Sequence, residues 1–296
     1  MPRRHAALAS ATFAAIALAA TGALAATGAL AACPSDEAVD ALAADMLALE
    51  PAKLAERPEA MEDALCAQGK LVERLSAEMG EPIGYKVGLT SKPAQERFGA
   101  GEPVRGVLMR SMLTGDGAEV ERFAARGLFE ADMLVRVRDD GINDATSTME
   151  VLEHIESVRP FIELADLVLA EGERLDPATI TAINVGARMG VTGDEVPAEA
   201  SEAFHDALAS MTVRMSAQPI GHPGDAKELL AVPGRAILGH PLEAVLWLMN
   251  DGVKLEAGDV VSLGSFGAPQ PAEPGQTVIV RYEGLPRDPQ VSVTLK

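Results

Sequence analysis

The stretch "GLFEADMLVRV", residues 127–137, combines strand-forming side chains with two acidic ones. In an extended strand, residues i and i+2 point to the same side. Glu130 and Asp132 therefore share one side, and Leu134 continues that face toward the interior. Burying two like charges beside apolar side chains is costly unless a positive group lies between them. The stretch predicts a strand whose acidic face binds something positive.

Composition limits the kinds of partner that this chain can bind. The 296 residues are 48% hydrophobic, which is ample for a large core in one or two domains. A formal net charge of -19 disfavours nucleic acid, because the phosphate backbone would be repelled. Aromatic residues make up only 3%, which argues against aromatic platforms for sugars or bases. An anionic substrate would have to be attracted by a local cation.

Residues 1–32 have the composition of a bacterial secretory signal peptide. Arg3 and Arg4 precede an uncharged Ala/Leu-rich stretch, and Ala-Leu-Ala occurs at 23–25 and at 29–31, where either copy could precede a cleavage site. The alternative is a retained membrane anchor, which the weakly hydrophobic, Ala-rich stretch disfavours. We expect an exported, periplasmic protein.

Two cysteines allow two interpretations of the mature N-terminus. The residues "LAAC", 30–33, resemble the lipobox of bacterial lipoproteins, in which the cysteine is lipidated and becomes the first residue. Alternatively, Cys33 keeps its thiol in an oxidising compartment and pairs with Cys66, the only other cysteine in the chain. The sequence leaves both interpretations open.

Periodicity predicts an N-terminal helical region, 33–82, followed by a β-rich domain, 83–296. Apolar residues at helical spacing predict helices at 36–49 and 58–80. Later helices are expected at 147–157, 200–210 and 241–250. Strands are expected at 83–88, 105–110, 128–137, 181–192, 212–216, 259–263, 277–283 and 290–295. Residues 217–238 are expected to form a loop with one short helix. Many short strands with few helices predict an α+β fold with curved antiparallel or mixed sheets.

A third acid, Glu163, is embedded in the apolar stretch "RPFIELADLVL", residues 159–169. Together with Glu130 and Asp132 it would provide the oxygen ligands that Mg²⁺ or Mn²⁺ prefers. The alternative is that the first two acids face solvent on an edge strand while Glu163 pairs with Arg159.

Two further stretches carry candidate polar residues. Lys86 lies in "GYKVGLTSK", residues 84–92, and a lysine held near a metal site can have a lowered pKa and transfer protons. His240 opens "GHPLEAVLWLMN", residues 239–250, where it could contact a ligand. A histidine before proline is more commonly a structural turn residue.

Five motifs in this order resemble one enzyme family. They are "GYKVGLTS", the pair Glu130-x-Asp132, "P-x-x-E-L" ending at Leu164, "GHPL-x-A-V-x-W-L-x-N" and "L-x-A-G-D-V-V-S-L-G-S". Together they resemble the 2-keto-4-pentenoate hydratase and 4-oxalocrotonate decarboxylase family, within the fumarylacetoacetate hydrolase superfamily. The resemblance spans residues 36–296, which is nearly the whole mature chain.

The resemblance implies a small N-terminal helical region followed by a mixed-β roll of the fumarylacetoacetate hydrolase type. It also implies a Mg²⁺ or Mn²⁺ site that chelates a 2-oxo or 2-enol carboxylate. By position, the implied metal ligands are Glu130, Asp132 and Glu163, and Lys86 matches the active-site lysine. The implied substrate pocket contains Leu89, Thr90, Ser91, Asn184 and Ser265.

Several positions depart from the family pattern. Asp132 stands where the hydratases usually have glutamate, which is one methylene longer. After Glu163, "ELADLV" keeps Asp166 but has Leu167 and Val168 where serine and arginine would stand. Two further polar side chains are lost at Gly186 and Gly267. The site therefore keeps its expected metal ligands but loses polar groups around them, which suggests an altered substrate or weakened catalysis.

The expected activity is hydration of a 2-hydroxy-2,4-dienoate or 2-oxo-4-enoate by a lyase that forms homo-oligomers. Lys86 is expected to transfer the proton, and Asp166 is the candidate for activating water. Decarboxylation or carbon–carbon hydrolysis of a related 2-oxo acid would use the same ligands. A third possibility is an exported protein that only binds such an acid.

Overall fold

The computed structural model describes residues 33–296, all of which belong to one compact unit. The expected signal peptide, and its alternative as a membrane anchor, lie outside the described residues. Within the described part of the chain, no helix is both long enough and apolar enough to cross a membrane. The expected helical region 33–82 is not a separate unit, because its helices pack directly on the sheet that follows.

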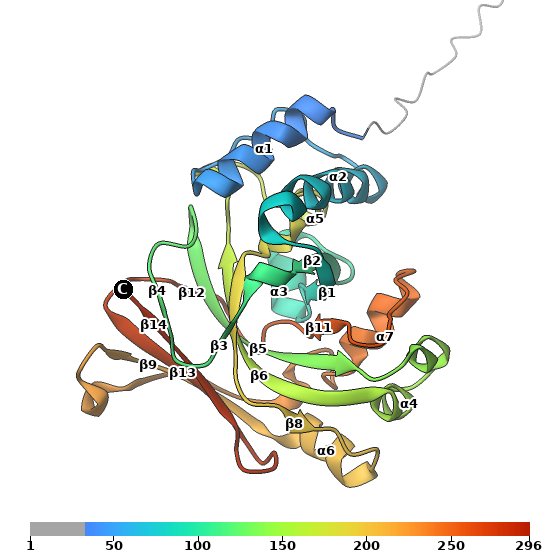
Figure 1. Cartoon of the computed structure of the whole chain (residues 1–296), viewed down its shortest axis with the longest axis vertical. Helices are drawn as coiled ribbons and strands as arrows, with labels where there is room; N and C mark the ends of the chain where they lie inside the picture. The colour runs from blue at the N-terminus through green and yellow to red at the C-terminus, as the bar shows by residue number, and fades with distance from the viewer. Residues whose placement is uncertain (1–32) are drawn as a thin grey trace, which may run out of the picture. The chain divides into compact units, whose positions relative to one another are not determined.

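The N-terminal helices α1 (Asp36–Ala48) and α2 (Met61–Met79) lie side by side at one end of this unit (Figure 1). Helix α1 begins where the side chain of Ser35 accepts a hydrogen bond from the Ala38 N–H, which satisfies one free donor of the first turn. The buried faces of both helices join a core cluster that also contains Leu134 and Phe161 of the sheet. The two helices therefore cover one face of that sheet.

The larger sheet has nine strands in the order β2-β1-β11-β5-β6-β7-β3, with β12 paired to β5 and β8 paired to β6. Their bounds are β1 (Pro82–Gly88), β2 (Val104–Met109), β3 (Leu113–Gly115), β5 (Gly127–Val137), β6 (Ile155–Asp166), β7 (Met189–Thr192), β8 (Val196–Pro197), β11 (Val260–Ser262) and β12 (Gln270–Pro271). Strand β5 lies between β11 and β6, so the acidic stretch is in the interior of the sheet. The alternative of an edge strand is wrong.

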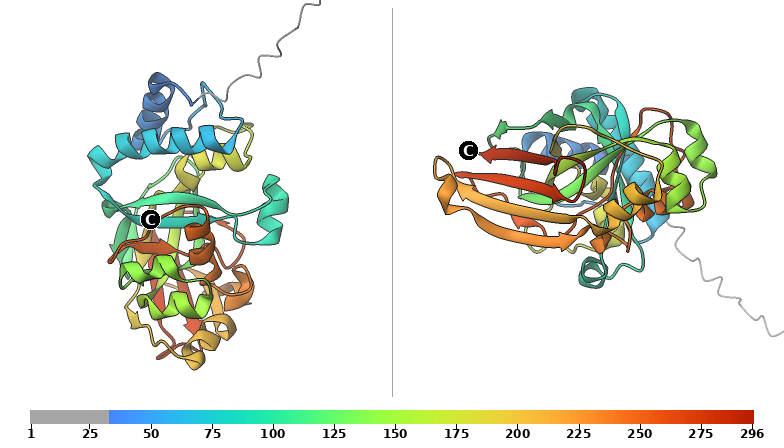
Figure 2. Two further views of the ribbon diagram at one scale, coloured as in Figure 1. Left: turned by 90° about the vertical axis from the view of Figure 1, so that its right-hand side faces the viewer. Right: turned by 90° about the horizontal axis from the view of Figure 1, so that it is seen from below.

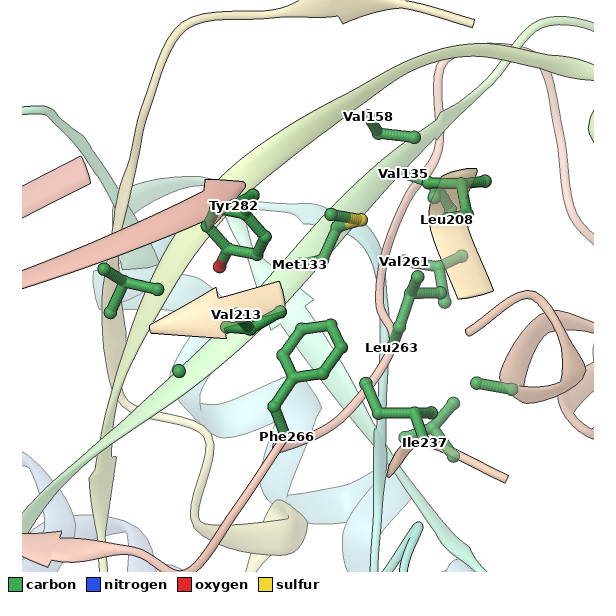
Figure 3. Close-up of a cluster of buried hydrophobic side chains, with 14 of the residues drawn as sticks. Met133, Val135, Val158, Leu208, Val213, Ile237, Val261, Leu263, Phe266 and Tyr282 are labelled. Carbon is green, nitrogen blue, oxygen red and sulfur yellow. The ribbon is translucent and has the colours of Figure 1, made fainter. Parts of the chain in front are cut away.

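The smaller sheet has five strands in the order β10-β9-β13-β14-β4, which curve side by side in Figure 2. Their bounds are β4 (Ala118–Val120), β9 (Thr212–Pro219), β10 (Lys227–Pro233), β13 (Gln276–Glu283) and β14 (Gln290–Leu295). Side chains from both sheets form the main apolar cluster, part of which Figure 3 shows around Met133, Val213 and Tyr282. Two curved sheets around one core, with helices outside them, confirm the expected α+β mixed-β roll.

Shorter helices connect and cover the strands. They are α3 (Lys92–Phe98), α4 (Thr148–Glu153), α5 (Pro177–Ala182), α6 (Glu202–Ser210) and α7 (Glu243–Asn250), with 3-10 turns η1 (Arg110–Met112), η2 (Asp140–Asp144), η3 (Asn184–Gly186), η4 (Pro223–Asp225) and η5 (Gly234–Ala236). Helix α5 packs on α2, and α4 contacts both α6 and α7. Figure 1 shows α5 beside α2, and α4 and α6 toward the opposite end of the unit.

Three expected elements differ from the structure in extent or type. The helix expected at 147–157 ends at Glu153, and β6 begins at Ile155. The strand expected at 181–192 is instead the end of α5, the turn η3 and the short strand β7. The loop expected at 217–238 contains the end of β9 and the strand β10. Strand β6 is buried on both faces, so it lacks the alternation that marks a half-exposed strand.

A disulfide joins Cys33 to Cys66 on α2, with their Cα atoms 5.6 Å apart. The ammonium of Lys70, also on α2, donates to the Pro34 carbonyl at 2.9 Å and contacts the carboxylate of Asp36. These contacts attach the segment before α1 to α2. Of the two interpretations of Cys33, the structure contains the disulfide. A sulfur bonded in this way cannot also carry a thioether-linked lipid.

Candidate active site

Strands β5 and β6 place three carboxylates on one face of the larger sheet. Glu130 and Glu163 are directly opposite each other in the antiparallel ladder, and Asp132 is opposite Phe161. Opposite residues in such a ladder point to the same face, as do residues i and i+2 along a strand. Glu130, Asp132 and Glu163 therefore share the face that the sequence predicted.

Strand β1 brings a lysine to the same face. Lys86 pairs with Ser262 of β11, and Ser262 pairs with Leu134 of β5, so these side chains point the same way as the carboxylates. The ammonium of Lys86 donates to a carboxylate oxygen of Glu163 and, at 3.0 Å, to the carbonyl of Val185. Lys86 and Glu163 are each 4% exposed. The positive group beside the acids in this structure is the Lys86 side chain.

The carboxylate of Asp132 is fully buried and is directed toward β11. Its Oδ2 accepts a hydrogen bond from the Ser262 hydroxyl at 2.5 Å, and its Oδ1 accepts from the N–H of Gly264 at 3.0 Å. The Met133 N–H also donates to Oδ1, at 2.5 Å. Three donors hold this side chain in place.

Burial makes ionisation of the carboxyl groups on the acidic face unfavourable. Burial first, and the charge of Glu163 second, raise the pKa of Glu130 to about 8. The same two causes raise the pKa of Asp132 to about 7, although the hydrogen bond from Ser262 opposes the shift. If Glu130 and Asp132 are ionised as well as Glu163, one ammonium group does not neutralise the three carboxylates, so ionisation of this face calls for further positive charge.

The pKa of Lys86 moves in the opposite direction to the one expected from sequence. Burial alone would lower it, but the charges of Glu163, Glu130 and Asp132 raise the pKa of Lys86 above its ordinary value. The lowered pKa was expected beside a bound metal ion, and that expectation stays a prediction.

The donor set fits a hard divalent cation in its chemistry. Three carboxylates on one buried face, with more negative charge than Lys86 neutralises, are the oxygen ligands that Mg²⁺ and Mn²⁺ prefer. Among residues 33–296, no group of three or more His, Cys, Asp or Glu side chains is gathered in this structure as a metal cluster. Glu163 is bonded to Lys86 and Asp132 to Ser262 instead. The ligand roles of the three acids stay predictions.

The expected pocket wall lies just after β1. Thr90 is buried against Gly264, where an added Cβ would meet the Thr90 hydroxyl oxygen at 2.5 Å. The hydroxyl of Ser91 caps α3 by accepting from the Ala94 N–H at 3.4 Å, and the carbonyl of Leu89 accepts from the side chain of Gln95 at 3.0 Å. Of these three residues, Thr90 contacts the loop that holds Asp132.

Asn184 is hydrogen-bonded to the backbone of strand β2. Its side-chain Oδ1 accepts from the Val107 N–H at 2.7 Å, and its Nδ2 donates to the Val107 carbonyl at 2.9 Å. Both hydrogen bonds orient the next residue, Val185, whose carbonyl accepts from Lys86. In this structure the side chain of Asn184 supports that carbonyl, and its expected substrate-binding role stays a prediction.

Asp166 lies on the opposite face of the sheet from the carboxylates. It is three residues after Glu163 in β6, and an odd offset in a strand reverses the side. Its oxygens accept from the N–H groups of Ala125 at 3.1 Å and Arg126 at 2.9 Å. The structure gives Asp166 a structural role in place of the expected activation of water.

Of the remaining candidate residues, Ser265 lies near the carboxylates, whereas His240 and Arg159 have partners elsewhere. Ser265 lies beside Glu130 and opposes the rise in the pKa of that acid, while its hydroxyl donates to the Gly267 carbonyl at 2.6 Å. His240 accepts from the Leu242 N–H at 3.1 Å and stacks on His205, which matches the structural turn alternative. Arg159 pairs with Glu195 at 2.5 Å, so its expected pairing with Glu163 is wrong.

Sequence reasoning missed Ser262, the Gly264 N–H and the Val185 carbonyl. Ser262 is in the quoted family motif "L-x-A-G-D-V-V-S-L-G-S", but nothing in that motif shows that β11 pairs with β5. The other two are backbone groups, and only the folded chain reveals them.

Comparisons with known proteins show which family the chain resembles in sequence and fold. No protein-family profile matches the chain. The 2-hydroxyhexa-2,4-dienoate hydratase of Comamonas testosteroni is 32% identical over 221 residues, which cover 72% of this chain and 79% of that protein. The 4-oxalocrotonate decarboxylase of Pseudomonas sp. strain CF600 is 26% identical over 228 residues, which cover 75% of this chain and 82% of that protein.

A solved structure shares the fold over nearly its whole length. The 4-oxalocrotonate decarboxylase from Pseudomonas putida G7, complexed with magnesium and adipate, has a TM-score of 0.73 and 26% sequence identity. The match covers 89% of this chain and 99% of that one. On this similarity of sequence and fold, the chain belongs to the 2-keto-4-pentenoate hydratase and 4-oxalocrotonate decarboxylase family of the fumarylacetoacetate hydrolase superfamily.

Proposed function

We propose that this protein is a hydratase, a lyase that adds water to a 2-hydroxy-2,4-dienoate or the related 2-oxo-4-enoate. The observation that carries the proposal is the convergence of Lys86 with Glu130, Asp132 and Glu163 on one buried face. The hydratase relative from Comamonas testosteroni supports the reaction class.

The three carboxylates would hold Mg²⁺ or Mn²⁺, and magnesium is bound in the related decarboxylase structure. When bound there, the ion would polarise the oxygens of the acid and favour its enolate form. The ligand roles of the acids and the choice of ion are part of the proposal.

Lys86 is the proposed proton donor. Its Nζ is oriented by the Val185 carbonyl and by Glu163, and its raised pKa keeps it as an ammonium. A proton passes from Nζ to the distal carbon of the dienol, the enol O–H proton is released and restores the ammonium, and a 2-oxo-3-enoate results. The oxygen of water then bonds to C4 and a proton to C3, which completes the hydration.

Decarboxylation is the second candidate, because two relatives that act as 4-oxalocrotonate decarboxylases match the chain over most of its length. Both reactions pass through an enolate, so the same carboxylates and Lys86 serve either one. A protein that only binds a 2-oxo acid is the third candidate, and the polar groups lost at Gly186 and Gly267 support it.

One experiment separates these candidates. The mature, oxidised protein is incubated with Mg²⁺ and 2-hydroxypenta-2,4-dienoate, and separately with 4-oxalocrotonate. We expect loss of the dienol absorbance in the first incubation without release of carbon dioxide in the second. Carbon dioxide release from the second would identify a decarboxylase. Background rates in both, with measurable binding of oxalate, would identify a binding protein.

Export to the periplasm and assembly as a homo-oligomer are also proposed. The signal-like residues 1–32 support export, and so does the disulfide between Cys33 and Cys66, because disulfides persist in oxidising compartments. The location can be tested by fractionating the producing cells and by fusing residues 1–32 to a reporter protein. Export predicts that both the protein and the reporter are found in the periplasmic fraction.

A further inference from the structure

Tyr282 of strand β13 extends from the smaller sheet to the strands that carry the carboxylates. Its side chain is fully buried in the apolar cluster of Figure 3, edge-on to Phe266 with 6.1 Å between the ring centroids. Its hydroxyl donates a hydrogen bond to the carbonyl of Asp132 and accepts one from the Phe161 N–H at 3.2 Å. The phenol therefore bonds to β5 and to β6 at the same rung.

Asp132 and Phe161 are directly opposite each other in the β5–β6 ladder. The carbonyls of Ala131 and Met133 accept from residues 266 and 263 on the other side of β5, so the backbone groups of Asp132 face β6. In an antiparallel ladder, an opposite pair of this kind normally exchanges its N–H and carbonyl groups directly. Here the Tyr282 hydroxyl takes part in that exchange.

We infer that Tyr282 is a positioning residue for the proposed metal ligands. The rung that it bridges carries Asp132, and Glu130 lies opposite Glu163 two residue pairs further along the same ladder. Removing the hydroxyl would take one hydrogen-bond partner from each of two buried backbone groups, the Asp132 carbonyl and the Phe161 N–H, and so change the spacing of β5 and β6 at this rung. Distances between a metal and its ligands tolerate only about 0.2 Å, so a small movement weakens binding. This inference rests on the proposed metal site.

A purely structural alternative must be separated from this role. A buried tyrosine hydroxyl usually needs a hydrogen-bond partner wherever it lies, and losing that partner lowers stability. A structural role predicts that stability falls and that metal affinity does not change. A positioning role predicts that metal affinity falls as well.

The test compares Tyr282→Phe with Phe204→Leu, a control in the same apolar cluster on helix α6. Mn²⁺ affinity is measured by the electron paramagnetic resonance signal of free Mn²⁺, and thermal unfolding is followed on the same samples. We expect Tyr282→Phe to weaken Mn²⁺ binding about 10-fold or more, in the range found for groups that orient metal ligands. Phe204→Leu should lower the unfolding temperature and leave the affinity within about 2-fold. Unchanged affinity in Tyr282→Phe would overturn the inference.

A second measurement needs no substitution at Tyr282. The chain has two tyrosines, Tyr85 and Tyr282, so protein labelled with 3-fluorotyrosine gives two fluorine resonances that a Tyr85→Phe variant assigns. We expect Mg²⁺ to shift the Tyr282 resonance at the concentrations where the ion binds. A resonance that does not move while Mg²⁺ binds would overturn the inference.

The outcomes also separate this inference from the proposed hydratase activity. If the wild-type protein shows no turnover but Tyr282→Phe still binds Mn²⁺ more weakly than the wild type, the inference is supported and the activity is rejected. If the wild-type protein shows turnover and Tyr282→Phe binds Mn²⁺ as tightly as the wild type, the activity is supported and the inference is rejected. Failure of the wild-type protein to bind Mn²⁺ would reject both.

Discussion

Lys86 and Glu163, 77 residues apart in the chain, form an ion pair in the interior of the protein. Both side chains are almost fully buried, and the Val185 carbonyl accepts a second hydrogen bond from the lysine. The pair joins β1 to β6 across the larger sheet and brings the ammonium to the acidic face. It leaves Glu130 and Asp132 with raised pKa values, so the face has room for further positive charge.

Replacing Lys86 should remove turnover and spare metal binding. If Lys86 is the proton donor, Lys86→Met should lower kcat by about 10²- to 10⁴-fold, the range for loss of a general acid. Mn²⁺ affinity should stay within a few-fold, because the three carboxylates remain. Lys227→Met, at an exposed position on β10, is the matched control. Full activity of Lys86→Met, measured by loss of dienol absorbance, would eliminate this residue as the donor.

Two carboxylates on opposite faces of the sheet should behave differently when neutralised. Glu130→Gln should abolish Mn²⁺ binding, because it removes an anionic ligand from the acidic face. Asp166→Asn should bind Mn²⁺ normally and lose about 1–3 kcal/mol of unfolding free energy, because an amide cannot accept both backbone N–H groups of residues 125 and 126. Calorimetric Mn²⁺ titration and urea unfolding measure the two effects. Normal Mn²⁺ binding by Glu130→Gln would contradict the proposed ligand set.

Stabilisation by metal should depend on pH. The pKa values of Glu130, about 8, and Asp132, about 7, lie above the ordinary 4.5 and 3.8, so the folded metal-free protein keeps protons that the unfolded chain has released. The stability from these groups is complete below the ordinary values and is lost as the pH rises through about 7 to 8.

A cation that binds the ionised carboxylates would offset that loss. We therefore expect Mg²⁺ to raise the thermal unfolding temperature more at about pH 8.5 than at about pH 5.5. The comparison uses one Mg²⁺ concentration, with EDTA as the metal-free reference and Glu130→Gln as the control. Equal stabilisation at both pH values would show that these acids are not the binding groups.

The turn after α5 should control the orientation of Lys86. Asn184 and Val185 both have φ of 55°, a conformation that is unfavourable for a β-branched residue such as valine. Asn184→Ala removes both bonds to Val107 and should cost about 1–3 kcal/mol of stability, together with a lower kcat. Val185→Gly keeps the carbonyl and relieves the backbone strain, so its kcat should match the wild type. Loss of stability in Asn184→Ala without a change in kcat would limit this turn to a structural role.

The disulfide should contribute substantially to stability. Cys33 and Cys66 are 33 residues apart, and closing a loop of this size restricts the unfolded chain by about 3–4 kcal/mol. Urea unfolding of the mature protein with and without a reducing agent measures this effect, and a Cys33→Ala/Cys66→Ala variant should be insensitive to the reductant. A wild-type protein with the same unfolding midpoint in both conditions would contradict the prediction.

The acidic face could be predicted because one local rule governs it. Glu130 and Asp132 are two residues apart in a strand-forming stretch, and the alternation of side chains fixes their common direction. The position of Lys86 could not be predicted in this way. It depends on the parallel pairing of β1 with β11, strands that are far apart in the chain. The family resemblance, and not the local pattern, linked Lys86 to the acids.

The errors at residues 155–166 and 181–192 have a common physical cause. Strand β6 and the segment after α5 are buried on all sides, so their apolar residues show neither the period of a strand nor that of a helix. Without the knowledge that residues 155–166 form one strand, nothing placed Asp166 on the face opposite Glu163. The hydrogen bonds of Asn184 could not be predicted because its partner is the backbone of β2, which leaves no trace in the side-chain pattern.

The most direct test is a crystal structure of the mature protein equilibrated with Mn²⁺ and oxalate, with data collected at the manganese absorption edge. The account predicts an anomalous peak about 2.0–2.2 Å from carboxylate oxygens of Glu130, Asp132 and Glu163, with oxalate on the same ion. An empty map at this position, with Glu163 still bonded to Lys86 and Asp132 still bonded to Ser262, would contradict it.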